Sequence, residues 1–182
     1  MKSLAPLIEV RPARIGDADG IARVHSESWR ATYRDILPTW YLNGLTPTRL
    51  ASRWRENLPG EAQALVAEHN GRIIGFATGG RPRAPGALTA ELFMLYLLPA
   101  YQGRGAGRGL LAAMMARFCA EGQTAMRLWV VASNYPARGF YHAMGGRPFD
   151  ERTEPFAGIP VPEIAYRWTD LRRSQKFLIR NK

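Results

Sequence analysis

Cysteine is nearly absent from this chain of 182 residues, which has Cys119 alone. One cysteine cannot form an internal disulfide, and no Cys/His cluster has zinc spacing, so we expect no disulfide framework and no metal. Long apolar runs are also missing, since the longest, around 92–98 and 110–116, fall short of the roughly 18 residues of a membrane span. The N-terminal residues lack a signal-peptide apolar core. We therefore expect a cytoplasmic protein with no membrane partner.

Acidic residues are few compared with basic ones, because 15 Asp and Glu face 25 Lys and Arg, giving a formal net charge of +10. Part of the excess lies after residue 169. Almost all the cations are arginines, which match phosphate geometry but also serve on any solvated face. The charge leaves a nucleic-acid-binding module open as an alternative function, although no RNA-binding aromatic motif or helix-turn-helix pattern supports it.

The composition is that of a globular protein, with 46% hydrophobic and 10% aromatic residues, and the length fits one domain. Turn residues and the spacing of apolar residues predict a series of elements. In chain order these are a strand over 8–11, helices over 17–33 and 47–57, a hairpin over 64–79, a loop over 81–87, a strand over 90–98, a helix over 105–121, a strand over 126–131, a helix over 136–144 and a strand over 163–168. This order predicts one α/β domain with a mixed sheet over residues 1–169, followed by a basic C-terminal tail over 170–182.

The most informative segment joins the strand over 90–98 to the helix that follows it. Four of the seven residues at 103–109 are glycines, which let an anion approach the backbone. Unpaired N–H groups and the helix dipole favour negative charge at such a helix start. Arg104 and Arg108 stand there instead of an acidic residue. We expect an anion-binding turn, the alternative being an ordinary glycine-rich connection with solvated arginines.

Spacing argues against two nucleotide-binding motifs in this turn. A Walker A loop needs Gly-Lys-Ser/Thr, and no lysine occurs between residues 2 and 176. A dinucleotide fingerprint would need a glycine where Arg108 or Leu110 stands. The anion is therefore expected to be of another kind.

Gln102, Gly105 and Gly107 do fit the pattern Gln-x-x-Gly-x-Gly, and here the chain resembles the GCN5-related N-acetyltransferase superfamily. In that family the pattern binds the pyrophosphate of acetyl-CoA. The resemblance covers most of the chain, from the N-terminal strand and helix to the segment over 134–149. It implies a mixed, mostly antiparallel sheet flanked by helices and splayed between two central strands, here 91–98 and 126–131.

The resemblance implies an acetyl-CoA site in this chain, with no metal. Backbone groups of Leu95, Tyr96 and Leu97 would bond the pantetheine arm. The turn would bind the pyrophosphate through Gln102, Gly103, Arg104, Gly105, Ala106, Gly107 and Arg108. Asn134 matches a family position that contacts the cofactor arm, and capping of the helix that follows it is an equally good chemical reason for this residue.

The resemblance also implies two catalytic residues. Tyr141 matches the family's general acid, which protonates the leaving thiolate; anchoring of a short helix is its alternative role. Glu91 resembles a glutamate of the histone-acetylating branch that deprotonates the acceptor amine; its alternative is a solvent-exposed glutamate at a strand end. The ribosomal-protein branch places a glutamate five residues before the Asn, where this chain has Trp129, which puts ribosomal N-terminal acetylation in doubt.

The expected function is N-acetyl transfer from acetyl-CoA to a primary amine, by direct attack in a ternary complex. The first helical region would cover the acceptor cleft, with Trp29 and Tyr33 as substrate contacts, although core packing explains such residues as well. The acceptor class stays open between small-molecule and peptide amines, and so does a homodimer. A nucleic-acid-binding module on a retained acetyltransferase fold and a non-catalytic acyl-CoA sensor are the alternatives. Neither Cys119 as nucleophile nor His142 as base has a supporting motif.

Overall fold

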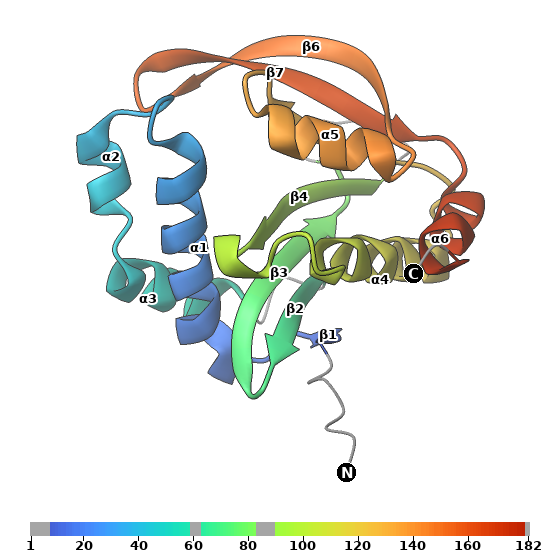
Figure 1. Cartoon of the computed structure of the whole chain (residues 1–182), viewed down its shortest axis with the longest axis horizontal. Helices are drawn as coiled ribbons and strands as arrows, with labels where there is room; N and C mark the ends of the chain where they lie inside the picture. The colour runs from blue at the N-terminus through green and yellow to red at the C-terminus, as the bar shows by residue number, and fades with distance from the viewer. Residues whose placement is uncertain (1–7, 59–62, 83–89, 181–182) are drawn as a thin grey trace.

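One mixed sheet flanked by helices forms the centre of the protein (Figure 1). The computed structural model describes residues 8–58, 63–82 and 90–180. Its strands are β1 (Glu9–Pro12), β2 (Ala64–His69), β3 (Arg72–Gly80), β4 (Ala90–Leu97), β5 (Met126–Val131), β6 (Arg147–Phe156) and β7 (Ile159–Trp168). Its helices are α1 (Ala18–Tyr33), α2 (Thr39–Gly44), α3 (Pro47–Asn57), α4 (Ala106–Ala120), α5 (Tyr135–Ala143) and α6 (Leu171–Arg180). The seven strands are ordered β1-β2-β3-β4-β5-β7-β6, and the predicted α/β class is confirmed.

The sheet opens between its two central strands, β4 and β5. These neighbours run parallel, and their ladder has two residue pairs, Ala90 with Met126 and Glu91 with Arg127. Past these pairs β4 stays paired with β3 up to Leu97, and β5 stays paired with β7 over its whole length. The two halves of the sheet therefore separate after Glu91, which confirms the predicted splay.

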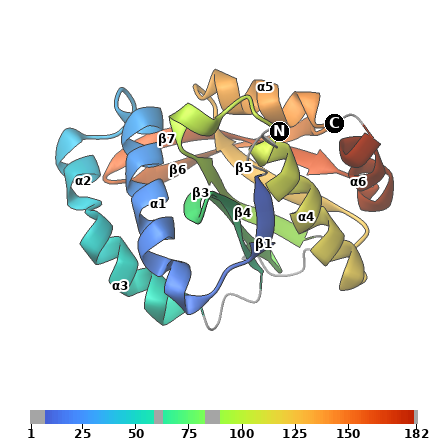
Figure 2. The ribbon, with the colours of Figure 1, turned by 60° about the horizontal axis from the view of Figure 1, so that its bottom comes forward.

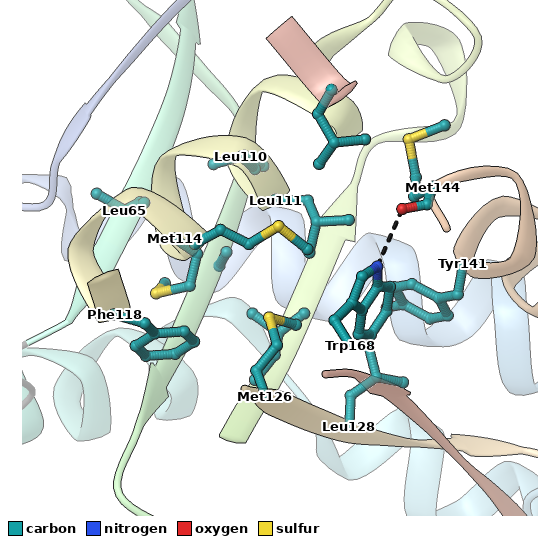
Figure 3. Packing of buried hydrophobic residues seen from close by; sticks show 14 of the residues in the cluster. Leu65, Leu110, Leu111, Met114, Phe118, Met126, Leu128, Tyr141, Met144 and Trp168 are labelled. Atoms are coloured by element: carbon teal, nitrogen blue, oxygen red, sulfur yellow. Dashed lines mark hydrogen bonds between the residues drawn. The ribbon is translucent and has the colours of Figure 1, made fainter. Parts of the chain in front are cut away.

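Helices lie on both faces of the sheet (Figure 2), and each face has its own hydrophobic core. On one face the helical spacing of α4 buries Leu110, Leu111, Met114, Met115 and Phe118 completely (Figure 3). On the other face α1 and α3 pack their apolar residues against β2 and β3. Burial of such side chains contributes about 1.5 to 3 kcal/mol each, so these two clusters fix the helices on the sheet.

A contact between β7 and the end of α5 fixes the helix that carries Tyr141. The indole Nε1 of Trp168 donates a hydrogen bond of 3.0 Å to the carbonyl of Met144 (Figure 3). The Trp168 ring also packs against Gly146, where an added Cβ would lie 2.6 Å from Cζ2. The ring of Tyr141 lies edge-on to Trp168, with centroids 6.3 Å apart. Strand β7 therefore holds the C-terminal end of α5 in position.

Three of the strands and α-helices that the structure describes are not among those expected from the sequence, namely α2, β6 and, described below, α6. Helix α2 begins right after Pro38, which the sequence analysis reads as a break in the helical pattern; proline also fits the position preceding a helix. Strand β6 is exposed along most of its length and contains Pro148 and Pro155, so it lacks the apolar alternation of a half-buried strand. The predicted loop over 81–87 lies largely outside the described residues.

Residues 171–180, part of the segment expected as a basic tail, form helix α6. Leu171 and Leu178, two turns apart, are buried at 0% and 1% exposure in the cluster that contains α4. The cations of α6 face outward, so this part of the chain is a packed helix with a basic surface. Among the helices in the described ranges, none has both the length and the apolarity to cross a membrane.

Shortening a buried side chain of α6 tests this packing. We expect Leu178→Ala to lower the free energy of unfolding by about 2 to 5 kcal/mol, because it leaves a cavity against α4. The neighbouring Ile179 is 53% exposed, so Ile179→Ala is a matched control that should change stability by less than about 0.5 kcal/mol. Urea denaturation followed by circular dichroism measures both. Equally small losses in the two variants would show that α6 is not packed.

Candidate active site

A cavity of about 720 Å³ lies where β4 and β5 separate. Its walls come from α1, α2, α3, α5, the two diverging strands and the β6–β7 hairpin, whose tip packs against the residues around α2 (Figure 1). The residues in its walls that the sequence analysis assigns to the site are Trp29, Tyr33, Glu91, Leu95, Tyr96, Asn134 and Tyr141. Segments far apart in the sequence thus meet in one cavity.

The glycine-rich turn follows the C-terminal end of β4. After a short 3-10 helix over Pro99–Tyr101, the chain turns at Gly103 and Gly105, whose φ angles are 72° and 85°. Other residues rarely adopt these angles, so glycine is required here by the backbone. Helix α4 then begins at Ala106, and its first N–H groups have no partner within the helix.

Gly107 has a different role from the two glycines before it. A Cβ at this position would lie 3.2 Å from Cδ1 of Leu97 and 3.4 Å from the ring of Phe140. The glycine therefore allows α4 to pack closely against β4 and α5. This close approach places the start of α4 beside the opening of the sheet.

The charges around the turn favour an anion. The first turn of α4 includes Arg108 and has no acidic residue. The guanidinium of Arg104 lies over the ring of Tyr101, 5.7 Å from its centroid, and the amide of Gln102 donates to the carbonyl of Leu97 at 3.4 Å. The turn thus combines the N–H groups of a helix start with two nearby arginines, Arg104 and Arg108.

Tyr141 reaches the cavity from α5 and is 8% exposed. Burial, together with the nearby Tyr33, raises the pKa of its hydroxyl well above the usual range. The phenol therefore carries its proton at every physiological pH and can donate it. The ring packs against Tyr166 and Trp168, which hold it in place.

Two further tyrosine hydroxyls meet in the same cavity. The hydroxyls of Tyr33 on α1 and Tyr96 on β4 lie 3.1 Å apart and share a hydrogen bond. Burial raises the pKa of both phenols, so both stay neutral. A second contact joins the same elements, because the hydroxyl of Ser28 donates to the carbonyl of Leu97 at 3.0 Å. Helix α1 is therefore tied to the edge of β4 where the sheet opens.

Glu91 lies at the last residue pair before β4 and β5 separate. It is 9% exposed, and its Oε2 accepts a hydrogen bond of 3.0 Å from Nε of Arg127. The ion pair with Arg127 fixes the position of the carboxylate at this buried site. Glu91 is therefore a held carboxylate in the cavity wall, in contrast to a glutamate at a solvent-exposed strand end.

Asn134 combines a cavity position with a capping role. Its Oδ1 accepts a hydrogen bond of 3.2 Å from the backbone N–H of Ala137, which caps the N-terminus of α5. The structure therefore shows the helix-capping role that was the alternative expectation for Asn134. Its amide NH₂ group is not used by that bond, so a cofactor contact remains compatible with capping.

The hairpin wall of the cavity is not found by the sequence analysis. Here the guanidinium of Arg152 lies 4.0 Å above the ring of Trp129 and donates from Nε to Oε2 of Glu163 at 2.8 Å. Because side chains alternate along a strand, residues 152, 154 and 156 share the face of β6 that lines the cavity. That period of two is the signal that could have identified this wall, once β6 itself was recognised.

His25 is a second cavity residue that the sequence analysis does not assign. Its ring lies among Trp29, Trp54, Phe76 and Tyr96, with centroids 5.3 to 6.0 Å away. Burial, with a smaller contribution from Arg53, lowers the pKa of His25 to about 4. The imidazole is therefore neutral at physiological pH.

In the part of the chain that the structure describes, no group of His, Cys, Asp and Glu side chains could hold a metal ion.

The buried imidazole predicts a loss of stability in acid. The unfolded chain binds a proton at His25 near pH 6.5, whereas the folded protein does so near pH 4, so the free energy of unfolding falls as the pH drops through this window. The loss between pH 7 and 4.5 is roughly 2 to 3 kcal/mol. We expect His25→Gln to remove it in urea denaturation at the two pH values. His142 is exposed, so the control variant His142→Gln should keep the loss of stability between pH 7 and 4.5. The same loss in His25→Gln would contradict the prediction.

Comparisons with known proteins agree with this geometry. The family model of the acetyltransferase (GNAT) family matches residues 27–145. The uncharacterized N-acetyltransferase YuaI of Bacillus subtilis is 34% identical over 167 residues, which cover 91% of this chain and 95% of YuaI.

Two solved structures share the fold. The structure of yncA from Salmonella typhimurium with its cofactor acetyl-CoA has a TM-score of 0.69 at 21% identity, covering 90% of this chain and 94% of yncA. The PaiA N-acetyltransferase of Thermoplasma acidophilum, in complex with coenzyme A, has a TM-score of 0.65 at 24% identity, covering 89% of this chain and 99% of PaiA. The match to the family model and the likeness to YuaI decide the assignment: this chain belongs to the GNAT family and is an N-acetyltransferase.

Proposed function

We propose that this protein transfers the acetyl group of acetyl-CoA to a primary amine, by direct attack of the amine in a ternary complex. The observation that carries the proposal is the opening of the sheet directly beside the glycine-rich start of α4. Family membership and the cofactors named for yncA and PaiA support the same cosubstrate. Each part of the site then has a task that follows from its chemistry.

The split sheet suits the pantetheine arm of the cosubstrate. Past Glu91, the side of β4 that faces β5 has no ladder partner among the described strands. Backbone groups of residues 95–97 that point to this side need hydrogen-bond partners, except the carbonyl of Leu97, which already accepts from Ser28 and Gln102. The two amides of pantetheine can provide them by lying along β4 as an extra strand would.

The turn between β4 and α4 suits the pyrophosphate. Its site would comprise the backbone from Gly103 to Arg108, where the helix N–H groups and Arg104 supply hydrogen bonds and positive charge. Gln102 would orient the turn through its bond to Leu97. Asn134 would contact the arm from the connection between β5 and α5 while it caps α5.

Tyr141 would protonate the sulfur that leaves. As the amine nitrogen bonds to the acetyl carbon and the C–S bond breaks, the hydroxyl proton moves to the sulfur, giving CoA as a thiol. A thiolate is as poorly solvated in this cavity as a phenolate, so the transfer is concerted with bond breaking and depends on proximity. The raised pKa keeps the proton on Tyr141 until that moment.

Glu91 would accept the proton that the acceptor nitrogen loses. Its carboxylate is paired with Arg127 and lines the same cavity as Tyr141. Counted from the ammonium form of the acceptor, the nitrogen loses two protons. One passes through Glu91 to solvent, and the second, lost as the amide forms, restores the phenol of Tyr141 after that residue has protonated the sulfur. The products are the amide, CoA as a thiol and one released proton. Trp29 and Tyr33 would contact the acceptor from α1.

A thermal-shift panel tests the cosubstrate. Acetyl-CoA or CoA at about 100 times its Kd adds roughly 2.7 kcal/mol of stability, which corresponds to roughly 5 to 10 °C in Tm for a chain of this size. ATP, NAD, DNA and RNA are the comparison ligands. Shifts of equal size with ATP or NAD, or none with CoA, would refute the cosubstrate. A shift with nucleic acid alone would favour the nucleic-acid-binding alternative.

Two conservative variants separate the acid from the base. Tyr141→Phe should lower kcat by roughly 10- to 10⁴-fold and leave the CoA-induced Tm shift unchanged, because only the proton donor is lost. Glu91→Gln should show a defect that shrinks from pH 7 to pH 9.5, since more of the amine is then neutral without a base. Rate profiles against pH measure both. A pH-independent defect would exclude Glu91 as the base, and full single-turnover activity in Tyr141→Phe would exclude it as the acid.

A further inference from the structure

Aromatic rings from three elements converge at the hairpin side of the cavity. Trp29 on α1 has ring centroids 5.0 Å from Tyr33 and 5.4 Å from Phe156 of β6. Phe156 in turn lies 5.4 Å from Tyr41 of α2. All four rings line the cavity and are partly exposed. A cavity wall of this kind binds a flat apolar group by stacking and by burial of its surface.

A carboxylate lies next to these rings. Glu163 of β7 also lines the cavity, and its side chain is 19% exposed. Its negative charge helps to raise the pKa of Tyr33, which places the carboxylate within electrostatic reach of the ring cluster. A positive group stacked among these rings would be attracted by the rings and by Glu163 together.

The cation beside Glu163 is already engaged. Arg152 pairs with Glu163 at 2.8 Å and with Glu154 at 3.3 Å, and its guanidinium covers the ring of Trp129. Two carboxylates share one guanidinium, so this wall carries an excess of negative charge. Arg152 also has no free pair of N–H groups with which to hold a carboxylate of a substrate. The wall therefore favours a cation and disfavours an anion.

From these features we infer that the acceptor is an arylalkylamine, a primary amine on a flat apolar body without a carboxylate. Trp29, Tyr41 and Phe156 hold the ring of the acceptor, and Glu163 draws in its ammonium group, which then loses its proton to Glu91. This inference rests on the proposed function, because it names the acceptor of that same reaction.

A set of matched amines tests the acceptor class in an assay of CoA release. Phenethylamine is the reference, n-butylamine lacks the ring, L-phenylalanine adds a carboxylate, and spermidine replaces the ring with further cations. We expect kcat/KM for phenethylamine to exceed that for n-butylamine by about 10- to 100-fold, since the ring wall gains nothing from a short chain. L-phenylalanine should be at least about 10-fold poorer than phenethylamine, because its carboxylate faces Glu163.

Two variants test the named residues with phenethylamine. Phe156→Leu should raise KM about 3- to 30-fold and leave KM for n-butylamine nearly unchanged. Glu163→Gln should raise KM about 10- to 100-fold with little change in kcat, because the Glu163 carboxylate attracts the ammonium group of the acceptor and takes no part in proton transfer. Glu151→Gln removes the same charge from the opposite, exposed face of the hairpin and is the control. The Tm shift with acetyl-CoA shows that each variant is folded.

The outcomes separate this inference from the proposed function. A higher kcat/KM for spermidine or L-phenylalanine than for phenethylamine overturns the inference and leaves the proposed acetyl transfer in place. If Arg53→Gln abolishes a preference for L-phenylalanine, the residue that binds the carboxylate lies in the α3 wall of the cavity. An unchanged KM in Glu163→Gln overturns the role of that carboxylate. No transfer to any of these amines, in a protein that acetyl-CoA stabilises, overturns the inference, whereas a protein that neither acetyl-CoA nor CoA stabilises refutes the proposed function.

Discussion

The short ladder between β4 and β5 is the constraint on which the rest of the structure depends. Two residue pairs join these strands, and the ladder ends at Glu91 and Arg127. If pairing continued, the hydrogen-bonding groups of β4 would be satisfied by β5 and the cavity would close. The ion pair at this point therefore marks both the end of the continuous sheet and the beginning of the cavity.

Burial has opposite effects on different groups around this cavity. It keeps the phenols of Tyr33, Tyr96 and Tyr141 and the imidazole of His25 neutral. Each carboxylate in the same surroundings has a guanidinium beside it, Arg127 for Glu91 and Arg152 for Glu163. The cavity thus contains neutral donors and paired carboxylates at once, an arrangement that composition cannot disclose.

Local rules explain what the sequence predicted well. The turn before α4 depends on the backbone angles of glycine and on the geometry of a helix end, which are properties of a few consecutive residues. The glycine turn at Gly105 and the start of α4 could therefore be predicted from the sequence. Family resemblance added Tyr141 and Tyr96, which the structure brings into one cavity. Strand β6 depends on a distant partner, β7, and has no strong pattern of its own. Helix α6 does have helical spacing of its buried Leu171 and Leu178, which the interpretation of this segment as a basic tail overlooked. Missing β6 also hid Phe156 and the pairing partner of Glu163.

The position of β7 has a consequence for how the protein matures during synthesis. This strand lies between β5 and β6, although it is made after both, and the pairings of β6 in the described sheet are all with β7. Trp168, at the C-terminal end of β7, also holds the end of α5, the helix that carries Tyr141. A nascent chain on the ribosome therefore lacks one wall of the cavity and the support of α5 until residues 159–168 have emerged. The site is completed by β7, the last of the seven strands in chain order, so a chain terminated before residue 159 can hold the glycine-rich turn without holding a complete active site.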